Sequence, residues 1–160
     1  MLHPVLLGGN VDMTDARATL RVLYGDTDAM GQAYYGNYMR WFEVGRAEWF
    51  RTLGTSYRRL EEDGIFLPVI EAHCRYFKPA FYDDLLEIET RFRFSGPARL
   101  RFDYTIRKNG PDGPIAEGYT VHVCVDAQRR VLKPPAPLRS LLEKHQVQQG
   151  TSPSQRQPRP

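Results

Sequence analysis

The feature that most constrains the fold is the regular alternation of apolar and charged residues in the second half of the chain. In residues 85–95 (LLEIETRFRFS), every second residue from Leu86 is apolar or Thr, and charged residues fill most positions between. Residues 98–108 (ARLRFDYTIRK) repeat the pattern. Successive side chains of a β-strand point to opposite faces, so this period of two predicts strands with one buried and one polar face. Such strands are typical of antiparallel sheets.

Three further segments complete the predicted sheet. Residues 18–24 (ATLRVLY) alternate well enough for a strand, and residues 65–77 (IFLPVIEAHCRYF) form a longer one, in which Pro68 marks the beginning or an edge. Residues 115–126 (IAEGYTVHVCVD) form the last strand, after the turn cluster NGPDGP. The residues predicted to share a face are Leu20, Val22 and Tyr24 in the first of these strands and Val121, Val123 and Val125 in the last.

One long helix is predicted between the first strand and the others. Bulky apolar residues recur at helical spacing from 38 to 53, and Gly45 lies in the same stripe. Asn37 is the predicted N-cap, and Gly54 is predicted to follow the helix end. Shorter helices are predicted at 56–63 and 136–145. We therefore expect an α+β domain in which the long helix covers one face of an antiparallel sheet. The stripe contains Tyr38, Trp41, Phe42, Trp49 and Leu53, whereas Arg40, Glu43, Arg46 and Arg51 lie largely outside it.

The length and charge of the chain limit the number of domains and the class of partner that it can have. A chain of 160 residues fits a single domain with a substantial core. We predict a flexible N-terminal arm at 1–17, a folded domain at 18–146 and a disordered tail at 147–160, which is rich in Gln, Pro and Ser. The formal net charge is +3, and two of the positive charges are arginines of the tail. The chain as a whole therefore lacks the basic character of a nucleic-acid-binding protein.

The cysteines and the N-terminal sequence indicate the compartment. Cys74 and Cys124 form no C-x-x-C motif and no disulfide framework, which favours a reducing environment and a cytoplasmic protein. The first residues lack the basic leader of a signal peptide, and no apolar run approaches the length of a membrane span. We therefore expect no membrane association.

Histidine and cysteine side chains raise the question of a metal site. His73 and Cys74 are neighbours on a predicted strand, so they point to opposite faces and cannot easily share a metal ion. His122 and Cys124 do share a face, but two ligands make a weak case for zinc. We interpret all four as packing residues and predict no metal.

The most specific segment is YGDTDAMGQAYYGNYMRWFEVGRAEWF, residues 24–50. It resembles the signature of the 4-hydroxybenzoyl-CoA thioesterase family of hotdog-fold proteins. Residues 78–90 (KPAFYDDLLEIET) also resemble that family, and the similarity spans roughly residues 18–127. The matching elements are Asp26-Thr27-Asp28, Gly31, Tyr34-Tyr35, Asn37-Tyr38, Trp41-Phe42-Glu43 and Arg46.

This resemblance implies a fold, an assembly and a reaction. The fold is a hotdog, a curved antiparallel sheet wrapped around one long central helix. The assembly is a homodimer whose sheets join edge to edge, or a homotetramer built from two such dimers, with active sites at the dimer interface. The reaction is hydrolysis of an acyl-CoA thioester without a metal or separate cofactor, since coenzyme A is part of the substrate.

The resemblance also implies the site residues. Asp28 falls on the catalytic carboxylate of the family, and the backbone N–H groups around Tyr35, Gly36 and Asn37 polarise the thioester carbonyl. Relatives hold the nucleotide of coenzyme A with basic residues near the hairpin formed here by FSGPARLR, residues 94–101. This chain has Gly96-Pro97-Ala98 where some relatives carry consecutive basic residues, so Arg99 is the best remaining candidate for that contact.

The chemistry of these residues agrees with the resemblance. Thioester hydrolysis needs a nucleophile or base at the carbonyl carbon and a positive environment for the developing oxyanion. A carboxylate such as Asp28 supplies the first, either by direct attack or by taking a proton from water. The N–H groups and dipole of a helix N-terminus supply the second. Tyr35 replaces the His of some relatives and, with a usual pKa of about 10, cannot act as a base near neutral pH.

Other interpretations stay open at this point. Asp28 alone could be a turn or capping acid, and Asp26 is more simply a brace of the loop than a reacting group. An acyl-carrier-protein thioesterase, a hydratase and a non-catalytic acyl-CoA-binding module are alternatives on the same fold. The segment 24–50 contains no His, which disfavours a hydratase. The acyl group is not determined by the sequence.

Overall fold

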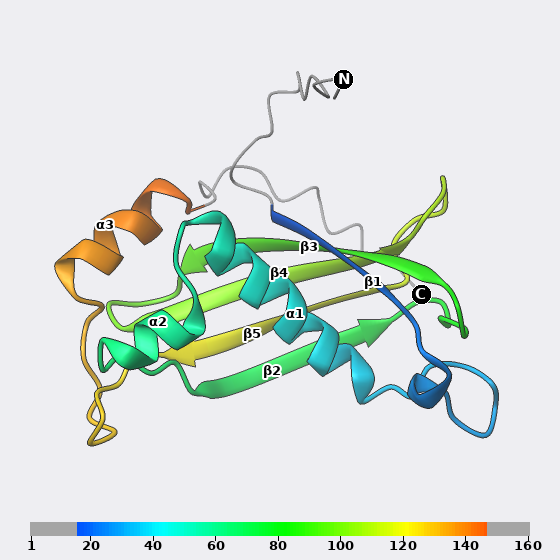
Figure 1. Cartoon of the computed structure of the whole chain (residues 1–160), viewed down its shortest axis with the longest axis horizontal. Coiled ribbons are helices and arrows are strands. Elements are labelled where there is room, and N and C mark those ends of the chain that lie inside the picture. Colours follow the sequence, from blue (N-terminus) through cyan, green and yellow to red (C-terminus); the bar gives the residue numbers. More distant parts are fainter. Residues whose placement is uncertain (1–15, 147–160) are drawn as a thin grey trace, which may run out of the picture.

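A computed structural model describes residues 16–146 as one antiparallel sheet and three helices (Figure 1). The predicted N-terminal arm (apart from its last two residues) and the tail lie outside the described residues. The strands occur in the order β1, β3, β4, β5, β2, and every neighbouring pair is antiparallel. The strands are β1 (Ala16–Arg21), β2 (Val69–Tyr76), β3 (Leu85–Phe94), β4 (Arg99–Lys108) and β5 (Ala116–Val123); the helices are α1 (Asn37–Thr52), α2 (Tyr57–Glu62) and α3 (Ala136–Lys144), with a 3-10 turn, η1 (Tyr24–Asp26).

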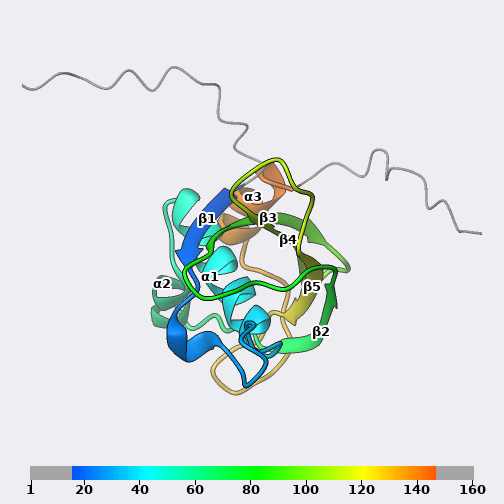
Figure 2. The same ribbon diagram turned by 90° about the vertical axis from the view of Figure 1, so that its right-hand side faces the viewer.

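The sheet curves around α1. Figure 2 looks nearly along this helix and shows the strands surrounding it, so the predicted hotdog arrangement is confirmed. Trp49 of α1 packs between Phe92 and Phe102, with ring centroids 5.1 Å and 5.4 Å away. Phe42 stacks on Tyr104 at 4.4 Å. Burial of one such side chain contributes about 2–3 kcal/mol, so this stripe against the sheet is the main source of stability.

Two glycines allow α1 to lie close to the sheet. A Cβ atom at Gly45 would lie 2.6 Å from Ile88 Cγ2, and one at Gly118 would lie 2.2 Å from the carbonyl oxygen of His73 and 2.7 Å from the Phe42 ring. Real Cβ atoms do not approach other atoms this closely, so both positions exclude larger residues.

The first and last strands differ from the prediction in detail. β1 begins at Ala16 and ends at Arg21, and the chain then turns into η1. Val22 is buried, but Tyr24 lies in η1 and is 79% exposed, so the predicted face of Leu20 and Val22 does not extend to Tyr24. In β5 the residues that face α1 are Gly118, Thr120 and His122, which pair across the sheet with Tyr104, Phe102 and Leu100. Val121 and Val123 share a face, as predicted, and it is the face that points away from α1.

The remaining elements follow the prediction. α2 and α3 form at the predicted segments, and Pro68 directly precedes the edge strand β2. Gly54 follows α1 with a φ of 78°, a left-handed conformation that glycine adopts without strain.

Arg46 was predicted to lie largely outside the buried stripe, and the structure places it in the interior. Its Nε donates to the hydroxyl of Tyr57 at 2.5 Å, and its Nη1 donates to the hydroxyl of Tyr104 at 3.1 Å. The chain of hydrogen bonds continues from Tyr104 to Thr120 at 2.8 Å and from Thr120 to His122 Nε2 at 2.9 Å. In the direction that suits a neutral His122, Tyr104 donates to Thr120 and Thr120 donates to Nε2 of His122.

His122 takes part in this network as a neutral ring. Its Nδ1 lies 2.8 Å from the carbonyl oxygen of Leu67, which accepts the ring proton, and Nε2 accepts from Thr120. Burial, helped by the positive charge of Arg46, lowers the pKa of His122 from 6.5 to about 4. The packing interpretation of this residue is confirmed.

A pH dependence of stability follows from His122. His122 binds a proton more readily in the unfolded state than in the folded state. The contribution of His122 to stability is therefore complete above pH 6.5 and is lost as the pH falls towards 4. The shift corresponds to a loss of about 3 kcal/mol. Urea unfolding at pH 7.5, 5.5 and 4.5 should show this loss in the wild type and a shallower dependence in His122→Gln. Equal pH dependence in both proteins would contradict the assignment.

Candidate active site

The loop between η1 and α1 is a tight, internally bonded turn. Thr27 and Ala33 form an isolated antiparallel bridge, and the N–H of Asp28 donates to the carbonyl oxygen of Gln32 at 2.8 Å. Gly31 closes the turn with a φ of 77° and donates to the carbonyl oxygen of Asp28 at 2.9 Å. Gly31 thus lets the backbone reverse, and the loop returns directly to the start of α1.

The Asp28 carboxylate is half-buried on this turn. Its Oδ1 accepts the N–H of Met30 at 2.8 Å, an arrangement that fixes the side chain against its own loop. Its Oδ2 forms no hydrogen bond with the described residues. One oxygen therefore orients the group, and the other is available to a substrate or a water molecule.

Asp26 has a different role, although it lies only two residues away. It is 5% exposed, its Oδ2 accepts the N–H of Leu23 at 2.8 Å, and its Oδ1 forms an ion pair with Arg40 of α1. Its carbonyl oxygen accepts the N–H of Tyr34 and the side-chain amide of Asn37, each at 2.8 Å. The prediction that Asp26 braces the loop is confirmed.

The start of α1 differs from the prediction at Asn37. Gly36 occupies the N-cap position with helical dihedral angles, and Asn37 is the first helical residue, so the predicted Asn37 cap was wrong. The reason is the Asp26 carbonyl, which captures the Asn37 side chain and turns it back towards the loop. A Cβ at position 36 would lie 2.7 Å from the exposed Tyr34 ring, which would have to move to admit a larger residue.

Two backbone donors are free at the helix entrance. The N–H of Asn37 donates to the carbonyl oxygen of Tyr34 at 3.0 Å, so it is already used. The N–H groups of Tyr35 and Gly36 donate to no group within residues 16–146. They lie at the positive end of the α1 dipole, where an anion is favoured. These two groups are the best candidates for the oxyanion site.

A pocket of about 340 Å³ opens beside this entrance. Its wall is mainly aromatic, and Gln32, the backbone partner of Asp28, contributes to it. Sequence analysis did not select Tyr76 or Lys78, which come from the end of β2 and the loop after it. The only feature of the sequence that points to them is their position at the end of a strand that was predicted to begin at Pro68 or to lie at an edge of the sheet. The lining residues are Gln32, Ala33, Tyr35, Tyr38, Tyr76, Phe77, Lys78 and Pro79.

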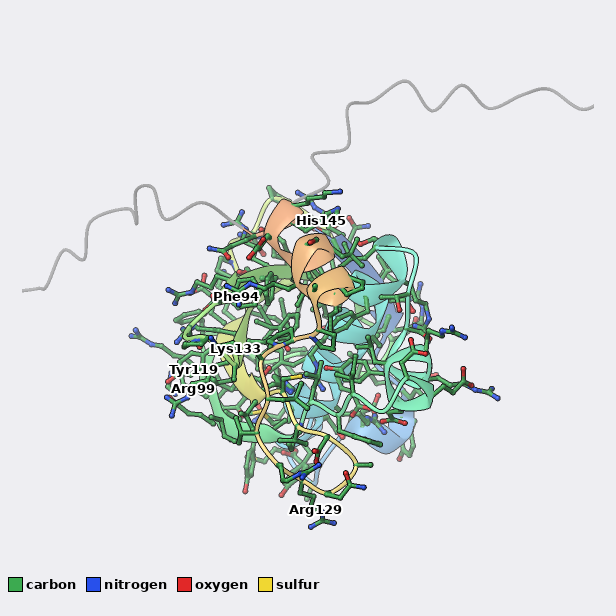
Figure 3. All side chains as sticks on the ribbon, turned by 90° about the vertical axis from the view of Figure 1, so that its left-hand side faces the viewer. Phe94, Arg99, Tyr119, Arg129, Lys133 and His145 are labelled. Carbon is green, nitrogen blue, oxygen red and sulfur yellow. The ribbon has the colours of Figure 1, made fainter. Side chains whose placement is uncertain are left out.

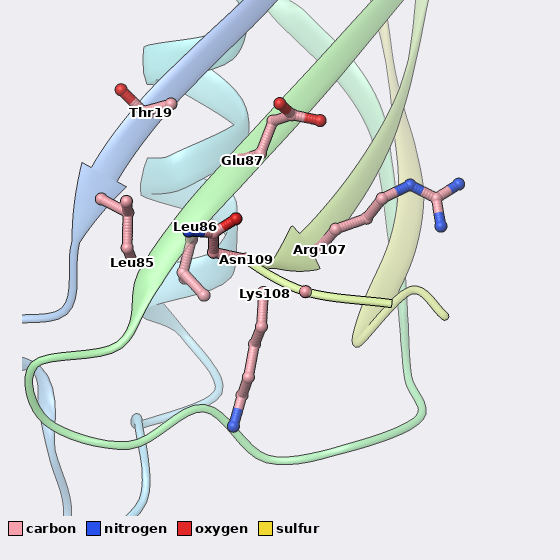
Figure 4. Close-up of a pocket in the computed structure, with 8 residues that line it drawn as sticks. Thr19, Leu85, Leu86, Glu87, Arg107, Lys108 and Asn109 are labelled. Carbon is pink, nitrogen blue, oxygen red and sulfur yellow. The ribbon is translucent and has the colours of Figure 1, made fainter. Parts of the chain in front are cut away.

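The loop after β2 is hydrogen-bonded to the loop that carries Asp28. Ala33 donates to the carbonyl oxygen of Ala80 at 2.8 Å. Asp84 holds this loop, because its Oδ2 accepts the N–H of Phe81 at 2.8 Å and lies 2.8 Å from Lys108 Nζ. Figure 4 shows a separate pocket of about 200 Å³ nearby, where Arg107 and Lys108 leave the end of β4 in opposite directions. Lys108 therefore serves the loop rather than a ligand.

Arg99 does not join Asp28 within one chain. It is an exposed residue at the start of β4, and it pairs in register with Val123 at the opposite end of the sheet. Figure 3 views the molecule from that end and labels Arg99. Within one chain, Arg99 therefore lies at the other end of the sheet from the Asp28 turn.

Within residues 16–146, no group of three or more His, Cys, Asp and Glu side chains is placed to hold a metal ion. In the same part of the chain, no helix has the length and apolar character required to cross a membrane.

Comparison with known proteins decides the family. The model of the thioesterase-like superfamily matches residues 22–147, which include the loop, α1 and the whole sheet except β1. The chain belongs to this superfamily. The resemblance to 4-hydroxybenzoyl-CoA thioesterases is thereby confirmed.

Individual relatives align with most of this chain. It is 32% identical over 126 residues to the acyl-CoA thioester hydrolase YbgC of Escherichia coli O157:H7, which covers 79% of this chain and 92% of the relative. It is 30% identical over 124 residues to a 1,4-dihydroxy-2-naphthoyl-CoA hydrolase of Synechococcus elongatus, with 76% and 90% covered. The crystal structure of a DHNA-CoA thioesterase from Staphylococcus aureus has a TM-score of 0.76 at 26% identity, covering 81% of this chain and 89% of that one.

Proposed function

We propose that this protein is an acyl-CoA thioesterase, which hydrolyses an acyl- or aroyl-CoA thioester to the free acid and coenzyme A. The observation that carries the proposal is the segment from Asp28 to Gly36. It holds a half-buried carboxylate with one free oxygen and two unused N–H groups at a helix N-terminus. The names of the relatives support thioester hydrolysis, because both the Escherichia coli and the Synechococcus proteins are CoA thioester hydrolases.

Each group has a defined task in this reaction. Asp28 acts as nucleophile or as general base, and the N–H groups of Tyr35 and Gly36 stabilise the negative charge that develops on the thioester oxygen. Water supplies the oxygen of the product acid, and the thiol of coenzyme A leaves with a proton. The reaction needs no metal and no separate cofactor in this proposal.

A homodimer completes the proposed site. β2 lies at an edge of the sheet, and Val69, Ile70 and Tyr76 on it are 50%, 50% and 43% exposed. If two copies pair antiparallel along β2, the Tyr76 end of one lies beside the Val69 end of the other. Val69 pairs with His122, one residue from the partner of Arg99, so this arrangement carries Arg99 of the second copy towards Asp28. The assembly is a homodimer or a homotetramer of such dimers, and light scattering coupled to gel filtration measures it.

The same pairing supplies space for the acyl group. A pocket of about 850 Å³ at the Val69 end is lined mainly by apolar residues, among them Phe66, Leu67 and Val131. The second copy places this pocket next to Asp28. Aryl and medium-length acyl groups fit an apolar space of this size. A cytoplasmic location remains a prediction, supported by the two free thiols.

The proposal is tested by thiol release from a panel of CoA thioesters with aryl, short-chain and long-chain acyl groups. We expect turnover of at least one of them, and faster turnover of the CoA thioester than of the matching carrier-protein thioester. Faster turnover of the carrier-protein substrate would support the acyl-carrier-protein alternative. Tight binding without thiol release would support a non-catalytic acyl-CoA-binding module and contradict the proposal.

A further inference from the structure

The hydroxyl of Tyr76 touches the peptide group that forms the proposed oxyanion site. It donates to the carbonyl oxygen of Tyr35 at 3.1 Å, from the last residue of β2 to the residue before Gly36. The same carbonyl oxygen accepts the N–H of Tyr38 at 3.3 Å, in the first turn of α1. A carbonyl oxygen has two lone pairs, so both bonds can exist together.

This contact fixes the direction of a free donor. The carbonyl group of Tyr35 and the N–H of Gly36 belong to one peptide group, which is planar and trans, so they point in opposite directions. A hydrogen bond that fixes the direction of the Tyr35 carbonyl therefore also fixes the direction of the Gly36 N–H. Hydrogen bonds in series polarise one another, so a donor on the carbonyl also makes the N–H a stronger donor.

The ring of Tyr76 is held independently of its hydroxyl. It packs edge-on against Tyr38 with centroids 4.9 Å apart, and Tyr38 is a buried residue of α1. It also meets the Tyr35 ring at 6.5 Å. Burial and the neighbouring Cys74 thiol raise the pKa of Tyr76, so the hydroxyl keeps its proton and remains a donor.

We infer that Tyr76 is a positioning residue for the reaction: it orients and polarises the Tyr35–Gly36 peptide, whose N–H then receives the developing oxyanion. This inference rests on the proposed thioesterase function. Tyr76 does not react with the substrate itself. Its contribution is smaller than that of a direct oxyanion donor, whose loss costs on the order of a hundredfold to a thousandfold in rate.

The test is Tyr76→Phe, which removes the hydroxyl and retains the packing of the ring. We expect kcat to fall about tenfold with KM within about twofold, because the lost bond acts mainly on the transition state; this fold-change corresponds to about 1.4 kcal/mol. Tyr82→Phe is the matched control, since Tyr82 lies in the loop after β2, is 58% exposed and has no hydrogen bond from its hydroxyl among the described residues. Tyr76→4-aminophenylalanine restores a donor and should recover most of the rate.

A vibrational measurement separates positioning from a structural role. In the Asp28→Asn background, the carbonyl stretch of a bound acyl-CoA should shift to lower frequency on binding, and adding Tyr76→Phe should reduce the shift. Equal kcat in Tyr76→Phe and wild type, or an unchanged carbonyl frequency, would overturn the inference. If the wild type releases no thiol from any substrate, the proposed function fails, but the frequency of a bound ligand still tests the effect of Tyr76 on the carbonyl.

Discussion

Replacing Asp28 with Asn is expected to lower kcat by about two to four orders of magnitude, the usual contribution of a general base, and to leave folding intact. Asn retains an oxygen that can accept the N–H of Met30, so the turn at 28–31 should persist. The substitution therefore removes the charge and the basicity and keeps the local geometry. Steady-state thiol release gives kcat and KM, and thermal unfolding checks the fold.

Asp26→Asn is the matched control, since it makes the same chemical change two residues away. Asp26 is buried and paired with Arg40, so its replacement should lower the melting temperature. Once corrected for the folded fraction, the rate should fall much less than in Asp28→Asn. A similar rate for Asp28→Asn and wild type, or a larger chemical loss in Asp26→Asn, would show that the reacting carboxylate has been misassigned.

Gly118→Ala is expected to cause a much larger loss of stability than a methyl group added at Gly113. The new Cβ would lie 2.2 Å from the carbonyl oxygen of His73 in β2 and 2.7 Å from the Phe42 ring. The nearest obstacle is backbone, so β2 must move away from β5 or the sheet must distort. We expect a loss of about 3 kcal/mol, in the upper range for overpacking, and a melting temperature lower by about 10 °C.

Gly113→Ala provides the comparison for this prediction. Gly113 is exposed, and a Cβ there meets no atom within 4 Å. Its substitution should change the free energy of unfolding by less than about 0.5 kcal/mol, as for an ordinary surface site. Calorimetry of both variants at one pH measures the difference. Equal melting temperatures would mean that β2 and β5 are packed less tightly than the structure indicates.

Sequence patterns predicted those elements whose environment repeats along the chain. The alternation at 85–95 and 98–108 became β3 and β4, because most of the alternating apolar residues there are buried on one face of the sheet. The stripe of α1 was predicted for the same reason. Patterns failed where a contact from a distant segment overrides the local preference. Asn37 suits an N-cap, but the Asp26 carbonyl binds its side chain.

The burial of Arg46 in the core could not be predicted from local patterns for the same reason. A charged residue is normally exposed, and the hydroxyls that accept from it lie on α2 and β4, 11 and 58 residues away. In the site, the resemblance placed Asp28 and the helix entrance, whereas the hydrogen-bond pattern identified which N–H groups are free. Tyr76 could not be found from the sequence, because its role depends on where an edge strand ends relative to a helix start.

The rigid connection between the loop and α1 has an evolutionary consequence. Asp26 ties the acid-bearing turn to Asn37 and Arg40, so a mutation that shifts one part shifts the other. New acyl preferences can therefore arise most easily at positions outside this unit, such as Phe66 or Val131, without disturbing hydrolysis. Directed evolution towards a different acyl group should accordingly accumulate substitutions there and spare residues 26–40.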